Sequence, residues 1–296
     1  MSATTSTTGP ATLRTSTPGM IRATRAELFR LRRWPAVWVT IGAWLLLSVL
    51  FGYVFDYLAY TTGDGFGPAQ GVPARELLAG ILPASVPSVL VQGMPMFGGA
   101  LMLVLGAMVA GSGYGWGTWK TAYTSGVRRT TVAGGSLLAL AVLVVAAVAA
   151  SLAVGVAASL GVAALESQAV TWPALGDLAA AVGTGLAVMG MWALLGFALG
   201  TVTRGTSLSV GLGLVWALVV ENLLRGVGAL LEEVATLTEV MPGTAAGSLV
   251  GSLGGVGGAP GVLDTLSGPV ALVTVLVYVV ALPAVTLAVV ARRDVS

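Results

Sequence analysis

The chain contains no cysteine and no histidine, and it has few charged residues of either sign. The first absence excludes disulfides, Cys/His metal sites, cysteine nucleophiles and Ser-His-Asp triads. Charged residues make up 9% of the 296 residues and hydrophobic residues 56%, whereas a soluble domain carries about 25% charged residues. A water-soluble surface cannot be built from so few charges, so lipid must be the solvent for much of the chain. With a net charge of only +2, the sequence indicates no nucleic-acid partner.

Motifs of catalysis are absent as well. The sequence has no G-x-x-x-x-G-K-[ST] loop, so it cannot cradle nucleotide phosphates. Its apolar runs contain no carboxylate pair and no serine–base dyad. Glycines alternate from Gly111 to Gly117 (GSGYGWG), which favours a loop hinge over a phosphate-binding loop, because no strand–turn–helix context surrounds them. We therefore expect no enzyme activity, no cofactor and no metal.

Six apolar runs are long enough, or nearly long enough, to cross a bilayer. They cover residues 35–55, 88–110, 134–165, 178–202, 205–222 and 270–290. As a helix the third run is roughly 48 Å long, so it must tilt or project beyond the bilayer. The fifth is short, and it either ends early or carries Glu221 to the membrane edge. Pro95 and Pro283 are expected to kink the second and sixth runs.

The positions of the basic residues give the orientation. Segments 1–34, 111–133, 203–204 and 291–296 contain 12 of the 14 Lys and Arg residues, and Arg75 and Arg225 lie in the alternate segments. Basic residues stay on the cytoplasmic side of a membrane protein. The sequence thus predicts an all-α integral membrane protein of the cell (inner) membrane, with six transmembrane helices over 35–291 and both ends in the cytoplasm (N-in/C-in).

Two segments precede the first run. Residues 1–19 are rich in Ser, Thr, Pro and Gly and are expected to be disordered, and Met20 is an alternative start to Met1. Residues 20–34 (MIRATRAELFRLRRW) place a narrow apolar stripe beside an arc of basic side chains, which predicts an amphipathic connecting helix at the membrane interface. The alternative is a simple positive anchor before the first span. The basic arc consists of Arg22, Arg25, Arg30, Arg32 and Arg33. A short cytoplasmic tail, 292–296, ends the chain.

The largest inner segment, 111–133, is the most informative. It predicts a short helix, TWKTAYT, which Thr118 can cap and Gly126 ends. Trp119 and Tyr123 are i,i+4 on this helix and share a face, so they could meet a cytoplasmic partner. The alternative is a loop whose aromatic residues lie at headgroup level, with the basic side chains held at anionic lipid. The candidate coupling residues are Gly117, Thr118, Trp119, Lys120, Thr121, Tyr123, Arg128 and Arg129.

Three further features lie in or beside the spans. Gln92 is a candidate pathway residue, although an interhelical hydrogen bond would explain it equally well. Gly196 and Gly200 form G-x-x-x-G, which suits close helix packing. Glu221 and Arg225 are i,i+4 and could form an ion pair at the outer membrane edge, the alternative being two solvated charges. Beyond them, 222–240 predicts one amphipathic helix, and 73–81 a short outer one.

Over residues 20–293 the sequence resembles the permease subunits of type-2 ATP-binding cassette (ABC) transporters, especially actinobacterial ones. The resemblance rests on the basic segment RAELFRLRRWPAVW, on the inner loop with G-T-W-K-T at Gly117–Thr121 and S-G-V-R-R at Ser125–Arg129, and on the long outer segment between the fifth and sixth runs. The sequence departs from the family where an acidic residue commonly precedes G-T.

The resemblance implies a dimer with a second permease copy or a related permease, and a separate cytoplasmic ATPase subunit. It implies that 20–34 is a connecting helix and that the loop after the second run holds a coupling helix. The expected function is therefore export driven by a partner's ATP hydrolysis. A membrane-embedded lipid-modifying enzyme and a sensor or immunity membrane protein are the alternatives. A neighbouring gene with a Walker-A ATPase would favour the transporter over both.

Overall fold

A computed structural model describes residues 19–65, 69–124, 126–254 and 259–292, and these residues form helices and turns without any strand. Six helices are long and apolar enough to cross a membrane. The chain is therefore an all-α, multi-pass membrane protein, as the sequence predicts. The expectations for 1–18 and for the last four residues of the tail lie outside the described residues.

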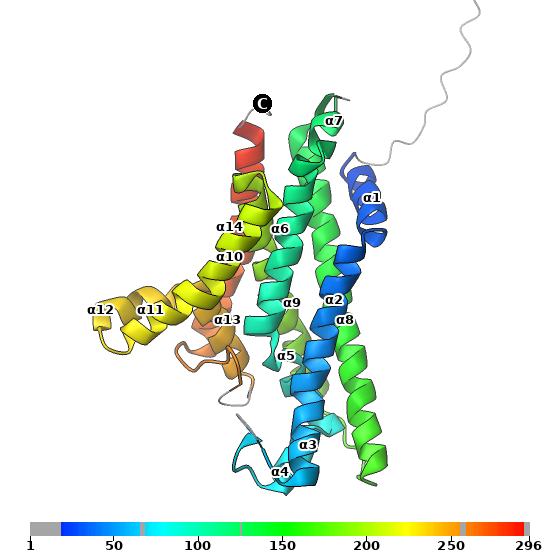
Figure 1. Cartoon of the computed structure of the whole chain (residues 1–296), viewed down its shortest axis with the longest axis vertical. Helices are drawn as coiled ribbons and strands as arrows, with labels where there is room; N and C mark the ends of the chain where they lie inside the picture. The colour runs from blue at the N-terminus through cyan, green and yellow to red at the C-terminus, as the bar shows by residue number, and fades with distance from the viewer. Residues whose placement is uncertain (1–18, 66–68, 125, 255–258, 293–296) are drawn as a thin grey trace, which may run out of the picture.

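Six candidate spans form the bundle, together with shorter helices between them (Figure 1). In chain order the helices are α1 (Gly19–Arg32), α2 (Pro35–Val49), η1 (Leu50–Val54), α3 (Phe55–Thr62), α4 (Ala74–Gly80), η3 (Pro83–Ser85), α5 (Val86–Gln92), η4 (Met94–Gly98), α6 (Gly99–Gly115), α7 (Thr118–Thr124), α8 (Arg129–Leu165), α9 (Leu175–Thr203), α10 (Thr206–Leu214), η5 (Val215–Val220), α11 (Glu221–Gly228), α12 (Glu232–Glu239), α13 (Pro242–Gly251) and α14 (Gly268–Arg292). Of these, η1, η4 and η5 are π-helical turns, in which one extra residue shifts the hydrogen-bond register.

The spans differ from their predicted runs: the second lies at Met94–Gly115 instead of 88–110, and the third begins at Arg129 instead of 134. Two further spans, the first and the fifth, continue well past the ends of their runs. The first continues through η1 and α3 to Thr62, because the amphipathic residues after Phe55 keep helical hydrogen bonds until Gly63 ends the helix at φ 78°. The fifth continues past Glu221 to Gly228. The single amphipathic helix expected over 222–240 is wrong, because the chain breaks between α11 and α12.

The second span is interrupted at its outer end. Pro95, which the sequence predicts to kink the span, lies in η4, where the amides of Phe97 and Gly98 both donate to the Gly93 carbonyl at 3.1 Å. Before it, α4 and the η3–α5 segment meet at a bend of 63°. By contrast, α14 continues as one helix through Pro283.

The centre of the bundle is the contact between α6 and α9. Here the backbones touch: a Cβ added to Gly196 would lie 1.9 Å from the Leu103 carbonyl oxygen, and one added to Gly106 would lie 1.9 Å from that of Ala193. A Cβ added to Gly200 would lie 2.9 Å from the Ala107 carbonyl oxygen. The predicted close packing at G-x-x-x-G is confirmed, because only glycine leaves room for this approach.

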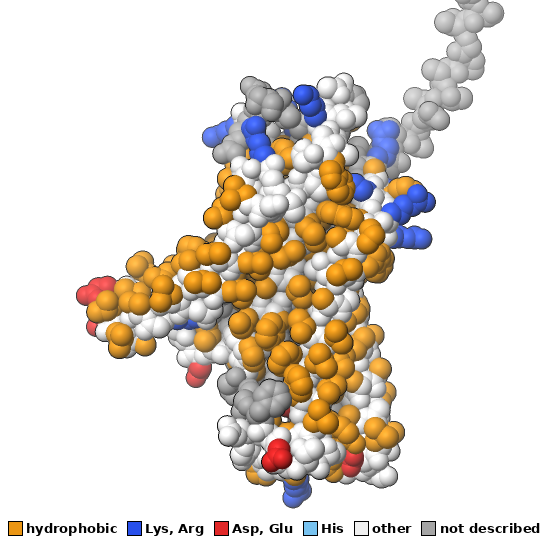
Figure 2. Space-filling view, in the orientation of Figure 1, with side chains coloured by type: hydrophobic (Ala, Val, Ile, Leu, Met, Phe, Trp, Pro, Cys, Tyr) orange, Lys and Arg blue, Asp and Glu red, His pale blue; other side chains and the backbone are white. Residues whose placement is uncertain are grey.

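The bundle has two chemically different ends. α1, α7 and the C-terminal end of α14 lie at one end, and α3, α4 and the end of α8 lie at the other (Figure 1). Most visible Lys and Arg side chains gather at the first end, which we call the arginine-rich end, while visible Asp and Glu side chains lie at the opposite, acidic end and at the tip of α12 (Figure 2). The α11–α12 hairpin, which we call the arm, projects sideways from the bundle (Figure 1).

Candidate functional site

At the arginine-rich end, the predicted short helix is present as α7. Gly117, at φ 67°, precedes it and Gly126, at φ 82°, follows it, so two left-handed glycines reverse the chain on either side. The Thr118 hydroxyl does not cap the first turn as expected. Instead it donates to the Gly113 carbonyl at 3.2 Å, and this contact fixes the start of α7 to the last turn of α6.

The sequence predicts that Trp119 faces outward, but in the structure it points into the bundle. Its side chain is 3% exposed, with its ring centroid 4.8 Å from Tyr114 of α6 and 6.5 Å from Phe197 of α9. The expected aromatic docking face is therefore wrong at Trp119. The predicted role of the Tyr123 side chain lies outside what the structure describes.

The glycines before α7 explain where the indole goes. The expected hinge at Gly111–Gly117 is wrong, because Gly111, Gly113 and Gly115 belong to the last turns of α6. A Cβ added to Gly113 would lie 1.8 Å from Trp119 Nε1. The missing side chain at this position thus makes the space that Trp119 fills.

The exposed surface at this end is mixed. Lys120 and Thr121 of α7 are exposed, as is Arg128, which precedes the first turn of α8. Arg129 is half-buried. Trp116, between α6 and α7, is 60% exposed, so a partner approaching this end meets an indole as well as these polar groups.

The first helix packs on protein along one side. Ala23 lies against Gly135 of α8 and Met20 against Gly134, while Leu31 is fully buried. The apolar stripe of α1 is therefore covered in part by α8, while Ile21 stays 44% exposed. Four of its predicted basic residues, Arg22, Arg25, Arg32 and Arg33, are exposed.

Arg30 is the exception among these arginines, because it turns toward the bundle. Its Nη1 donates to Ser112 Oγ of α6 at 2.9 Å, and its Nε donates to Glu27 at 3.1 Å. The guanidinium also lies 5.5 Å and 5.8 Å from the ring centroids of Trp34 and Trp116. This side chain therefore joins α1 to the end of α6, a role that a general basic arc does not reveal.

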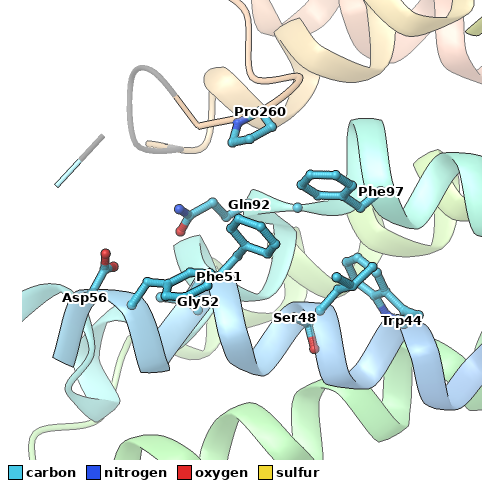
Figure 3. A pocket seen from close by; sticks show the side chains of 12 residues that line it. Trp44, Ser48, Phe51, Gly52, Asp56, Gln92, Phe97 and Pro260 are labelled. Atoms are coloured by element: carbon cyan, nitrogen blue, oxygen red, sulfur yellow. The ribbon is translucent and has the colours of Figure 1, made fainter. Parts of the chain in front are cut away.

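Near the acidic end, Gln92 lines a cavity between the first and second spans. With its open mouth included, the cavity contains about 720 Å³ of empty space. Asp56 and Gln92 lie at one end of it and Trp44 and Phe97 at the other, with Phe51 between them (Figure 3). Within the described residues the Gln92 amide makes no hydrogen bond, which does not favour the interhelical bond considered above. The pathway role of Gln92 stays a prediction.

The arm is anchored by Glu221, which is 0% exposed. Its Oε1 accepts a hydrogen bond from Trp216 Nε1 at 2.9 Å, and its Oε2 lies 3.8 Å from Arg225 Nη1. The structure thus brings the predicted pair together. The same carboxylate lies against Gly243 in the first turn of α13, where the positive end of the helix dipole favours an anion.

Two acids near the acidic end of the bundle have specific positions. Glu166, at the end of α8, accepts hydrogen bonds from Tyr57 Oη at 2.8 Å and Tyr60 Oη at 3.0 Å. Asp56 lies among aromatic residues in the cavity described above. The available signal for Asp56 was its place inside the aromatic run FGYVFDY.

The described residues hold no group of three His, Cys, Asp or Glu side chains able to bind a metal ion. No protein-family model matches the chain, and no curated protein matches it either. The geometry of these sites is therefore the basis for the functional argument.

Proposed function

We propose that the chain is the membrane-spanning permease subunit of an ABC transporter of the cell (inner) membrane. In this proposal it works as an exporter with a second permease copy or a related permease. A separate cytoplasmic ATPase subunit binds and hydrolyses ATP, and the chain itself carries no catalytic site.

The observation that carries the proposal is the packing of α7 against the centre of the bundle through Trp119. A permease without a nucleotide site can respond to ATP only through mechanical contact with its ATPase. Trp119 fixes α7 to α6 through Tyr114 and to α9 through Phe197. A force on α7 therefore passes directly to the two central helices, whose backbones are in contact.

The surroundings of α7 supply room for a partner. A hollow between α1, α7 and α8, with about 1,430 Å³ of empty space when its open side is included, is lined by Glu27, Arg30, Thr118 and Trp119 among others. Lys120 is exposed on the same helix. Because Arg30 joins α1 to the end of α6, a partner in this hollow would touch helices that are connected to one another.

Site-specific crosslinking tests this proposal. The chain has no cysteine, so Lys120→Cys provides a single thiol on α7, and Asp64→Cys provides a matched thiol near the acidic end. We expect the first, and not the second, to crosslink in membranes to a protein that contains a Walker-A motif, with a yield that changes when ATP is added. Equal labelling of that protein by both thiols, or by neither, would contradict the proposal.

A further inference from the structure

The cavity beside Gln92 is polar at one end and aromatic at the other (Figure 3). We propose that it binds an amphiphilic organic cation, a ligand with an aromatic or apolar body and one positive charge. As the substrate site of an exporter this inference rests on the proposed function. As a binding site it can be tested on the chain alone.

The aromatic end offers ring faces in fixed positions. Phe51 and Phe97 are stacked with centroids 5.1 Å apart and an interplanar angle of 24°, and Phe55 meets Phe51 edge-on at 5.1 Å. Trp44 is held by a hydrogen bond of 2.7 Å from its Nε1 to Ser151 Oγ. Such rings attract both apolar groups and cations through their faces.

The polar end supplies a negative charge without a positive partner. Asp56 is half-buried within the first span, and none of the residues that line the cavity is basic. The described residues place no ion-pair partner at this carboxylate. A carboxylate in a largely apolar segment is costly when unpaired, so a cationic group at this position would be favoured, whereas an anion would be repelled.

The lining and the backbone of the site suit a compact cation whose charge lies within an aromatic body. Phe55 and Asp56 are consecutive residues of the first span and both line the cavity, so a bound cation can meet the carboxylate and a ring together. Two π-helical turns, η1 and η4, face the cavity through Phe51 and Phe97. Such turns are frequent where a helix forms a binding site. Gly52 permits the close approach of Val89, since an added Cβ would lie 2.7 Å from it.

The test uses two probes of nearly equal shape and opposite charge, tetraphenylphosphonium and tetraphenylborate. Their saturable binding to the full chain in lipid nanodiscs is measured by equilibrium dialysis against empty nanodiscs, which corrects for partition into lipid. We expect saturable binding of the phosphonium and none of the borate. Asp56→Asn should weaken phosphonium binding about tenfold, equivalent to about 1.4 kcal/mol, and Phe51→Ala should weaken it severalfold.

Matched variants separate this effect from misfolding. Asp56→Glu keeps the charge and should retain binding, and Asp64→Asn removes an exposed outer carboxylate that does not line the cavity, so it should bind like the wild type. Saturable borate binding, absence of saturable phosphonium binding, or equal affinity of the Asp56→Asn and Asp64→Asn variants would each overturn the inference. No ATPase is present in this assay, so its outcome is independent of the crosslinking at Lys120→Cys.

Discussion

The α7 helix and the α11–α12 arm are both short amphipathic segments that follow a membrane span, yet the chain attaches them differently. Trp119 of α7 is 3% exposed, whereas Leu230 and Leu237 of the arm are 85% and 61% exposed. The inner helix is held by packing against the centre of the bundle. The arm is held at its base by the buried carboxylate of Glu221.

Glycine accounts for this difference. Gly113 leaves the space that the Trp119 indole occupies, while a Cβ added to Gly226 of the arm would meet nothing within 4 Å. An apolar stripe on a short helix therefore becomes core only where a neighbouring helix provides a matching space. Otherwise the stripe stays available to lipid or to another chain.

The largest expected effect comes from removing the indole that seats α7. Trp119→Ala should lower the free energy of unfolding by about 3–5 kcal/mol, because a fully buried aromatic side chain is lost and a cavity remains. Unfolding in mixed micelles of dodecyl sulfate and a mild detergent, followed by tryptophan fluorescence, measures it. As a control, Leu230→Ala on the arm should change stability by less than about 0.5 kcal/mol. A similar loss in both variants would remove the contrast between the two segments.

The next effect concerns the anchor of the arm. Glu221→Ala leaves Arg225 without its partner in a half-buried site, and breaking a buried pair costs about 3 kcal/mol. The same unfolding assay on Glu221→Ala, Arg225→Ala and the double variant should give non-additive losses. Losses that add within about 0.5 kcal/mol would mean that the two charges act independently.

A smaller effect is expected when the space for the indole is filled. Gly113→Ala should destabilise the protein by about 1–3 kcal/mol, since its Cβ forces Trp119 to move. It should also speed tryptic cleavage at the exposed Lys120, because α7 is no longer held to α6 by Trp119. Gly115→Ala, two residues along, meets nothing within 4 Å and is the matched control. Equal cleavage rates in the two variants would show that Gly113 does not position α7.

The smallest effect has the opposite sign. Gly226→Ala places a better helix former in open space on α11, so stability should rise by up to about 1 kcal/mol. The unfolding midpoint in the same micelles measures this change. Destabilisation would indicate that the exposed face of the arm is covered by another chain or by a tightly fitted lipid.

The membrane fold could be predicted from the sequence because a helix that crosses lipid is a long, continuous run of apolar residues. Long apolar runs and the distribution of Arg and Lys identify six helices, and Gly117 and Gly126 delimit α7. The directions in which individual side chains point could not be predicted in this way. Nothing local to Trp119 indicates that Gly113 leaves space for it. For Arg30 the local acid Glu27 indicates an ion pair, but it does not indicate the contact with Ser112, which lies far along the chain.

Two of the helical limits that the sequence misplaced have a common cause. The first span continues to Thr62 and the fifth to Gly228, although their apolar runs end earlier. In each case a charged residue, Asp56 or Glu221, lies inside the helix because the fold gives its carboxylate a particular environment. A hydropathy pattern shows that a charged residue is present, but it does not show which neighbouring residues surround that residue in the fold.

The position of α1 has a consequence during synthesis, because its packing partner α8 is translated later. Met20 and Ala23 pack against Gly134 and Gly135, which leave the ribosome roughly 110 residues later, or roughly 5–20 seconds at ordinary translation speeds. During that interval the first helix has no protein surface to cover its apolar stripe, and the bilayer surface is the available substitute. We therefore expect α1 to lie on the bilayer surface until the third span has been synthesised, and then to pack against α8.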